Sequence, residues 1–300
     1  MKTTLALTLT LSFTLGGDLL AADRVVPDQY PTIQAAIDAS VSGDKIYLDD
    51  GLYVEQIHID GKNIQIFGGL ATMIQPPAGF EGGIVTVTRG GHVGLYDIIL
   101  DGAAHGGSEK FYGVYVKGAQ ATLENVIVQN LKSTSCSTCQ VGLGAMVEPG
   151  GGEMSAITVV DSVFKTYQKG GIVARGDGTV VYLEDSAFIG SGDNPHVVQN
   201  GIQINDGAGG LIQGCYVSNH RYATDQWGAS GILLRNAQDI EVYQNLSQGN
   251  QVGIFNLTPQ AGWLSNINFK RAPVTDDNPI VARGKIQVTG IQVHNNVEFR

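Results

Sequence analysis

The chain has 300 residues, of which 43% are apolar, 15% are charged and 41 are glycine. This composition excludes a disordered chain, and the length suits one large domain or two small ones. The formal net charge of −10 argues against a nucleic-acid-binding protein, because such proteins need a basic surface to displace counterions.

The first 22 residues differ in composition from the rest of the chain. Lys2 provides a positive start, residues 5–15 are apolar and rich in threonine, and Ala21-Ala22 offers a small-residue cleavage site. An uncleaved membrane anchor is the alternative, but the segment is short for a membrane span and Asp18 interrupts it. We therefore predict a signal peptide over 1–22, a secreted or periplasmic mature protein, and no membrane insertion after cleavage.

Residues 24–70 are predicted to begin the fold. The stretch YPTIQAAIDAS (30–40) places Ile33, Ala36 and Ile37 at helical spacing, with Thr32 as a suitable N-cap. The stretch that follows, GDKIYLDDGLYVEQIHIDGKNIQIFGG, alternates apolar and polar residues as strands do. A helix at this end would cover strand edges that otherwise invite aggregation.

Between residues 83 and 256 a short motif recurs, in which a glycine is followed by an apolar residue and, in five of the seven copies, by a second apolar residue at its third position. The steps between these glycines are 30, 31, 27, 30, 30 and 22 residues. The glycines are Gly83, Gly113, Gly144, Gly171, Gly201, Gly231 and Gly253. Such alternation predicts a strand with one face inside and one outside.

Each motif is followed by a turn of small residues, a second strand and a residue that tolerates left-handed backbone. These residues are Asp97, Asn125, Asp161, Asp185, Gly214 and Asn245. Five of the six have an apolar residue three positions later, whereas the last has Gln248. The regularity indicates one structural unit repeated along the chain.

A unit of about 22 residues without a helix cannot bury its own apolar face, but stacked copies can. We therefore predict an all-β, single-stranded, right-handed parallel β-helix whose turns lie about 4.8 Å apart. A sandwich or propeller would need hairpin signals such as Asn-Gly. Residues 23–300 then form one domain, with the capping region and first coils at 24–70, regular coils at 83–256 and an irregular C-terminal cap at 257–300.

The chain has three cysteines. Cys136 and Cys139 lie in the loop STSCSTCQ, and Cys215 lies in a predicted strand. In an exported protein this spacing favours a disulfide within the loop and a buried, unpaired Cys215. A zinc site would need two further ligands at suitable spacing, and a redox-active pair would need a helix start after the first cysteine.

The N-terminal stretches YPTIQAAIDAS, GDKIYLDDGLYVEQIHI and KNIQIFG resemble the pectin lyase-like β-helix superfamily, and most of all the pectin methylesterases. The segment Gly51-Leu52-Tyr53-Val54-Glu55 has the Gly-x-Tyr-x-Glu form of a strand-turn in those enzymes. The resemblance implies the fold.

The resemblance does not imply an activity. The esterase motifs Gln-Asp-Thr, Asp-Phe-Ile-Phe-Gly and Gly-Arg-Pro-Trp are absent, and so is the Arg-x-Pro-x-x-Arg motif of pectate lyases. The Asp-Pro-His motif of mannuronan epimerases is approached only by Asp193-Asn194-Pro195-His196, which has one extra residue. A function must therefore be argued from individual residues.

The residues that extend each repeat beyond its core precede the recurring glycine. They are residues 103–112, 133–143, 166–170, 191–200 and 221–230. Insertions at one phase of a solenoid emerge on one side, so we predict that these five segments form a wall. Beside it, the second and fourth positions after each glycine should stack into a ridge: Tyr115 and Lys117, Met146 and Glu148, Val173 and Arg175, Gln203 and Asn205, Leu233 and Arg235.

A groove between wall and ridge would suit an extended acidic polysaccharide, because aromatic rings pack on sugar faces and cations bind carboxylates. Arg175 and Arg235 are candidates to neutralise a uronate carboxylate, and Lys169, His196, His220 and Tyr222 are candidates to exchange the acidified proton. The catalytic candidates are Lys169, Arg175, His196 and Arg235. The predicted substrate-binding residues are Tyr115, Lys117, Gln203, Asn205, His220, Arg221, Tyr222, Asp225 and Trp227.

Alternatives remain for several of these residues. Lys117, Arg175 and Arg235 also fit solvated surface charges. Asp177 and Asp206 fit a glycosidase carboxylate pair or, more simply, structural turn residues. No cofactor is expected; a calcium ion at clustered acids is left open, although the twelve-residue calcium loop is absent.

Two kinds of function fit these observations. One is a polysaccharide lyase or epimerase, and the other is a non-catalytic β-helix protein that binds carbohydrate or a surface or serves a structural role. In both cases the expected partner is a polysaccharide or surface, and the expected state is a monomer.

Overall fold

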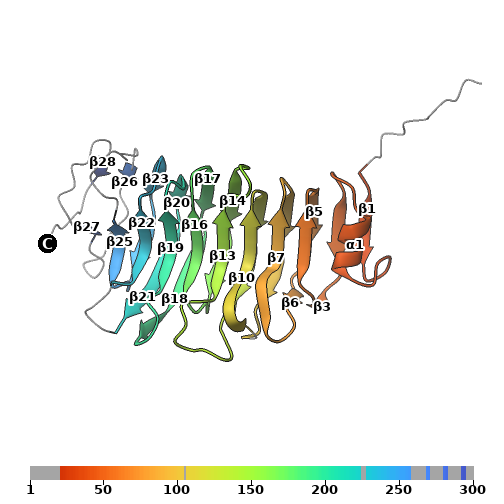
Figure 1. The fold of residues 1–300 in the computed structure, drawn as a ribbon, viewed down its shortest axis with the longest axis horizontal. Coiled ribbons are helices and arrows are strands. Elements are labelled where there is room, and N and C mark those ends of the chain that lie inside the picture. The colour runs from red at the N-terminus through yellow and green to blue at the C-terminus, as the bar shows by residue number, and fades with distance from the viewer. Residues whose placement is uncertain are drawn as a thin grey trace, which may run out of the picture.

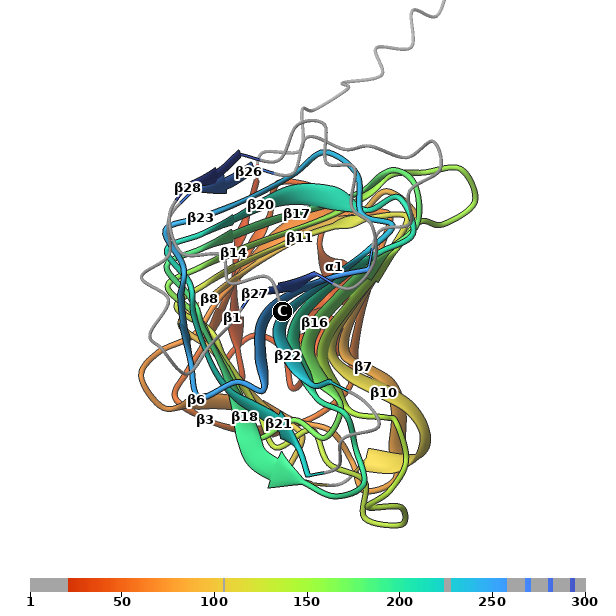
Figure 2. The same ribbon diagram turned by 90° about the vertical axis from the view of Figure 1, so that its left-hand side faces the viewer.

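The computed structural model describes residues 21–104, 106–223, 228–257, 268–270, 280–282 and 292–294. These residues form three long sheets whose strands are all parallel to their neighbours, and the chain winds from one sheet to the next (Figure 1). Within each turn it passes through sheet C, then sheet A, then sheet B, as the end-on view in Figure 2 shows. The predicted all-β parallel β-helix is confirmed.

Sheet A runs the length of the described structure and begins at the N-terminal end. Its strands are β1 (Asp23–Val26), β2 (Lys45–Leu48), β5 (Asn63–Phe67), β8 (His92–Tyr96), β11 (Gln120–Glu124), β14 (Ser155–Val160), β17 (Thr179–Glu184), β20 (Gly209–Gln213), β23 (Ile240–Tyr243), β26 (Asn268–Lys270) and β28 (Gln292–His294).

Sheet B and sheet C run beside it. Sheet B contains β3 (Gly51–Val54), β6 (Thr72–Gln75), β9 (Ile99–Asp101), β12 (Ile127–Gln129), β15 (Val163–Lys165), β18 (Ala187–Asn194), β21 (Tyr216–Tyr222) and β24 (Leu246–Gln248). Sheet C contains β4 (Ile57–Asp60), β7 (Phe80–Thr88), β10 (Gly106–Lys117), β13 (Leu143–Glu148), β16 (Gly170–Arg175), β19 (Asn200–Asn205), β22 (Ser230–Arg235), β25 (Val252–Asn256) and β27 (Ile280–Ala282).

The helix α1 (Ile33–Ala39) lies at the N-terminal end of the stack, as predicted (Figure 1). The Thr32 side chain accepts a hydrogen bond from the backbone N–H of Ala35 at 3.1 Å. The carboxylate of Glu55 accepts two more, from the backbone N–H groups of Ile33 and Gln34 at 3.0 and 3.1 Å. The glutamate of the Gly-x-Tyr-x-Glu segment therefore caps the helix, where an anion is favourable.

The recurring glycine is the second residue of β13, β16, β19, β22 and β25, and in β10 it is Gly113, inside a longer strand. In β7 the expected equivalence is off by one residue, because Gly83 pairs with Tyr112 and not with Gly113. A Cβ atom at Gly113 would lie 2.5 Å from the carbonyl oxygen of Gly144 in the next coil and 2.5 Å from Cγ1 of Val128. A Cβ at Gly144, Gly171 or Gly201 would likewise meet the carbonyl oxygen of the corresponding glycine one coil further on. The glycine recurs because the backbones of successive coils approach too closely there for a side chain.

The core is a set of inward-facing side chains that stack on their counterparts in the next coil. Phe164 and Phe188 are paired in register, and their rings stack with centroids 5.1 Å apart. Leu100, Val128 and Val217 occupy the same column and are fully buried. Each coil therefore buries its apolar face against its neighbours, as the repeat predicted.

The left-handed position after each sheet A strand was predicted correctly in five repeats and wrongly in the sixth. Positive φ is found at Asp97, Asn125, Asp161, Asp185 and Gly214, and in the sixth repeat it is found at Gln244 with φ 58°. Asn245 instead lies buried, accepting a hydrogen bond from the Cys215 N–H and donating one to the Ile212 carbonyl, both at 2.9 Å. The Asn245 amide thus supplies hydrogen bonds to backbone groups inside the stack. The left-handed position falls instead on Gln244, which is exposed.

Parts of the predicted organisation lie outside the described residues. These are most of the predicted signal peptide, from residue 1 to residue 20, and most of the predicted C-terminal cap. The described segments of that cap continue the sheets: β26 pairs with β23, β28 with β26, and β27 with β25. In the part of the chain that the structure describes, no helix has the length and apolar character of a membrane span.

Candidate functional site

The five predicted insertions all connect a strand of sheet B to a strand of sheet C, so they emerge on one side of the stack (Figure 2). We call residues 103–112, 133–143, 166–170, 191–200 and 221–230 the wall. Within it, His105 and residues 224–227, which include Asp225 and Trp227, lie outside the described residues. The predicted position of the wall is confirmed.

The outer face of the neighbouring sheet C strands, which we call the floor, also has the predicted register. Tyr115 pairs with Met146, Met146 with Val173, and Val173 with Gln203. One column over, Arg175 pairs with Asn205 and Asn205 with Arg235. Residues about 30 positions apart in the chain therefore lie side by side along one surface.

A groove with a volume of about 260 Å³ lies between wall and floor. From the wall, its lining includes Lys110, Tyr112, Gln140 and Lys169. From the floor, it includes Met146, Val173, Arg175, Gln203, Asn205 and Arg235. The lining thus carries four cationic side chains, and among the described residues the only carboxylate in it is Asp206. On a protein of net charge −10, this is a local basic site.

Lys169 immediately precedes β16 and projects into the wall of the groove. Its Nζ donates a hydrogen bond to the carbonyl oxygen of Val198 at 2.5 Å, and no ion pair involves it in the described part of the chain. Burial lowers the pKa of the Lys169 amine from 10.5 to about 8. The amine is therefore partly neutral at mildly alkaline pH, as a proton acceptor must be.

Arg175 is held by a carboxylate of the preceding coil. Its Nε and Nη2 donate to Oε2 of Glu148 at 2.8 and 2.5 Å, and the Tyr115 hydroxyl donates to Oε1 of Glu148 at 2.5 Å. Burial by itself raises the pKa of Glu148, but the hydrogen bonds from Tyr115 and Arg175 lower it overall. Glu148 therefore stays ionised and orients the guanidinium on the groove.

The remaining floor cations differ in their contacts. Arg235 donates from Nη2 to Oδ2 of Asp206 at 2.8 Å, and both side chains are about half exposed. Lys117 is exposed and lies beside Glu148 in the next coil, and its positive charge helps to lower the pKa of Glu148. Near them Tyr112 stacks on Tyr115 with ring centroids 5.1 Å apart, and burial raises the pKa of the Tyr112 hydroxyl. Tyr112 thus remains a proton donor at neutral pH.

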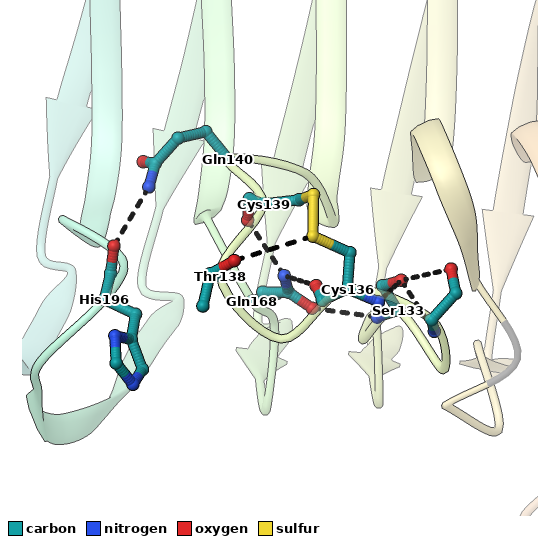
Figure 3. The surroundings of a disulfide bond; sticks show 8 residues. Ser133, Cys136, Thr138, Cys139, Gln140, Gln168 and His196 are labelled. Atoms are coloured by element: carbon teal, nitrogen blue, oxygen red, sulfur yellow. Dashed lines mark hydrogen bonds between the residues drawn. A yellow bond between two sulfur atoms is a disulfide. The ribbon is translucent and has the colours of Figure 1, made fainter.

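A disulfide closes the tip of the second wall segment. Cys136 and Cys139 are bonded, and Nε2 of Gln168 donates to both of their carbonyl oxygens at 2.7 and 2.8 Å (Figure 3). In the same figure, Gln140 donates to the carbonyl oxygen of His196 at 3.3 Å, which links this segment to the fourth. Cys215 is buried and unpaired.

The wall is also braced from inside. The side chain of Gln199 is fully buried, and its Nε2 donates to the carbonyls of Tyr167 and Gln168 at 2.9 and 3.0 Å and to Ser191 Oγ at 2.8 Å. Gln251 similarly accepts hydrogen bonds from the backbone N–H groups of Tyr222 and Ala229. The roles of these glutamines were not predicted from the sequence, because the sequence contains no pattern that indicates which groups a side-chain amide will bind.

The prediction that His220 contacts substrate is wrong, because the residue is fully buried. Its Nε2 accepts a hydrogen bond from the Tyr167 hydroxyl at 2.5 Å, and its Nδ1 donates to Oδ1 of Asn250 at 2.8 Å. Burial lowers the pKa of the ring to about 4. His220 faces inward because Asn219, with a φ of 62°, interrupts the strand alternation and turns the next side chain into the core.

Other predicted residues lie on the wall but outside the groove lining. Arg221 donates to Asp193 at 2.8 Å across β21 and β18, and both side chains are exposed. His196 is exposed, and Tyr222 is half-buried with its backbone held by Gln251. The structure therefore brings Lys169, Arg175, Gln203, Asn205 and Arg235 together, and leaves His196, Arg221 and Tyr222 apart from them.

The placement of acidic side chains bears on the calcium ion left open by the sequence. No group of three or more histidine, cysteine, aspartate or glutamate side chains gathers there as metal ligands require. Asp206 takes a left-handed turn conformation with φ 51° and pairs with Arg235. These residues do not fit a calcium site, so no step of the chemistry below is assigned to a metal.

Comparison with known proteins gives structural matches only. No protein-family model matches the sequence, and no curated protein matches it. Pectate lyase Pel9A aligns with 91% of this chain and 78% of its own, at a TM-score of 0.57 and 13% identity. A polygalacturonase from Erwinia carotovora ssp. carotovora aligns with 93% of this chain and 94% of its own, at a TM-score of 0.56 and 10% identity. At such identities the likeness is one of fold.

Proposed function

Starting from the right-handed parallel β-helix fold that this chain shares with those structures, we propose that its groove binds an extended acidic polysaccharide and that Lys169 removes a proton from a bound uronate. The observation that carries the proposal is a half-buried amine, with a pKa of about 8, on the wall of a groove whose floor presents two arginines. Two structures of the same fold are named as a pectate lyase and a polygalacturonase, and such names belong to enzymes that act on polysaccharides.

The charge of the groove supports an acidic ligand. Lys110, Lys169, Arg175 and Arg235 line it, and the cations are bounded by apolar and aromatic side chains that suit sugar faces. Arginine binds carboxylates through paired N–H donors, which adds geometric selectivity to attraction. A neutral glucan would not need this concentration of charge on an otherwise acidic protein.

The chemistry we propose is an elimination. A guanidinium beside the uronate carboxylate stabilises negative charge as the neighbouring C–H bond is broken. The neutral amine of Lys169 takes that proton, a C=C bond forms, the adjacent glycosidic C–O bond breaks, and the leaving oxygen takes a proton. Tyr112, which lines the groove with its proton retained, is the candidate donor. In an epimerisation a proton would instead return to the opposite face of the same carbon.

The second candidate function is polysaccharide binding without catalysis. It is favoured by the absence of the esterase, pectate lyase and epimerase motifs from the sequence. Binding without catalysis would use the same groove and the same cations. It differs from the elimination in that Lys169 would contribute only its positive charge. In both cases we propose that the protein acts outside the cytoplasm, on the basis of the predicted signal peptide at 1–22 and the disulfide.

The test is incubation with a panel of polyuronates while following the ultraviolet absorbance of unsaturated ends. We expect the rate to rise with pH through about 8, because only the neutral Lys169 amine accepts a proton. Lys169→Arg keeps a charge that does not titrate in this range, and it should lose about 100-fold or more in rate, the usual contribution of a general base, while retaining binding. Binding with no absorbance change and no change in sugar stereochemistry by NMR would leave the second candidate. A Lys169→Arg variant with full activity would remove the proposed base.

A further inference from the structure

On the floor of the groove, one side-chain oxygen has no hydrogen-bond partner among the described residues. Asn205 ends β19 and lines the groove, yet it is only 4% exposed. Its Oδ1 is buried and has no hydrogen-bond partner in the described part of the chain. A buried acceptor without a donor costs free energy, so a native protein that keeps one invites a functional explanation.

The surroundings of Asn205 could have supplied a donor but do not. Arg175 and Arg235 flank it in the same column, one coil before and one coil after. Their guanidinium groups donate to Glu148 and Asp206 instead. The acceptor is therefore buried without a described partner, between two arginines that are held in place by other groups.

The second floor amide of this strand is oriented to donate. Asn200 Nδ2 donates to Oε1 of Gln203 at 3.0 Å, and this fixes which end of the Gln203 amide is engaged. The Nε2 of Gln203 has no partner among the described residues, and Gln203 lines the groove on the same outer face as Asn205. The floor thus offers one hydrogen-bond donor, one acceptor and two cations within a single strand and its neighbours.

We propose that Asn205 accepts a hydrogen bond from a free hydroxyl of a uronate unit whose carboxylate lies by Arg175 and Arg235, and so selects polymers with unsubstituted hydroxyls. This inference rests on the proposed function. A hydroxyl has a proton to donate, whereas an acetylated or ether oxygen only accepts. A site built around such a bond rejects the analogue that lacks the proton, because the buried acceptor is then left unpaired.

The test compares two variants of the full chain. Asn205→Leu keeps the branching at Cγ and removes the unpaired acceptor. Ser218→Ala is the matched control, because Ser218 Oγ is also buried and without a described partner but lies on β21, outside the groove. Both substitutions remove a buried unsatisfied group, so neither should lower the melting temperature.

Binding is measured by calorimetry with a polyuronate oligomer and with the same oligomer after O-acetylation. We expect the affinity of wild type and of Ser218→Ala to be about 10-fold higher, or more, for the free form than for the acetylated form. Asn205→Leu should lose this preference through weaker binding of the free form. If wild type binds both forms equally, or if Asn205→Leu keeps the preference, the inference is overturned while the proposed function stands.

Two further outcomes are informative. If wild type and Ser218→Ala bind neither form, the proposed function itself fails and the inference fails with it. If Asn205→Leu does not fold, Asn205→Asp provides the second variant, because it keeps an acceptor at the same place. Asn205→Asp should retain the ratio between free and acetylated forms even if the added charge weakens both, and loss of that ratio would contradict the role of the acceptor.

Discussion

Burial acts on two titratable residues, Lys169 in the wall and His220 in β21 just before the fifth wall segment, and gives them different roles. Lys169 is half-buried on the groove, and burial lowers its pKa to about 8, close enough to working pH for proton exchange. His220 is fully buried, and its pKa of about 4 keeps the ring neutral between Tyr167 and Asn250. Access to the groove, more than residue type, separates a candidate for catalysis from a structural group.

His220 should make stability depend on pH. The pKa of its ring is lowered on folding from 6.5 to about 4, so the unfolded chain binds more protons between these values and stability falls as pH drops through that window. At about 1.4 kcal/mol per pKa unit, the loss between pH 7 and pH 4 is about 3 kcal/mol. Urea unfolding at several pH values measures it, and His220→Gln, which does not titrate, provides the reference that subtracts the carboxylates.

At the scale of elements, the recurring glycine is a requirement of close packing between coils. Gly113→Ala should lower the free energy of unfolding by about 1–3 kcal/mol, because the added methyl meets the Gly144 carbonyl and Val128. Gly51 has open space around its Cβ position and no left-handed backbone, so Gly51→Ala should be close to neutral. Chemical denaturation of both variants tests this, and equal stabilities would contradict the packing argument.

The wall depends on glutamines that cross from one loop to the next. Gln199→Leu would leave the Tyr167 and Gln168 carbonyls without their buried donor, and each unsatisfied group costs about 1–3 kcal/mol. We expect faster proteolysis within 166–170 and 191–200 and a lower melting temperature. The exposed Gln120 makes no described side-chain hydrogen bond, so Gln120→Leu is the control and should resemble wild type.

At the scale of the whole molecule, the groove is a basic strip on an acidic protein. Attraction between its cations and a polyanion is screened by salt, so affinity for a polyuronate should fall as ionic strength rises. Arg175→Ala and Arg235→Ala should each weaken binding by about 10-fold and flatten this salt dependence, without loss of folding. Titration at two salt concentrations measures both effects. Normal affinity in both variants would remove the groove as the binding site.

Much of the fold could be predicted because its signals are local. The alternation in GIVAR (171–175) decides which side chains of β16 face inward, and the recurring glycine marks where each coil meets the next. The helix 33–39 was signalled by Thr32 and three spaced apolar residues. One register detail failed at Asn245, because a buried hydrogen bond overrode the local preference of asparagine for a turn.

The candidate site was predicted in outline. The repeat period places Lys169, Arg175, Asn205 and Arg235 along one flank, since equal spacing in the chain becomes adjacency when coils stack. The period does not say which atoms meet. Glu148 forms an ion pair with Arg175, and Asp206 forms one with Arg235. The left-handed backbone at Asn219 turns the His220 side chain into the core.

By itself, the sequence determined the path of the chain, the buried columns and the side on which the long connections emerge, because periodicity and repeat length act at every coil alike. The tertiary structure decided the partners of the polar side chains, the depth at which Lys169 is buried and the burial of the unpartnered acceptor at Asn205. Hydrogen bonds and desolvation depend on a few tenths of an ångström between atoms of different coils, and that distance is set only when the coils are packed together.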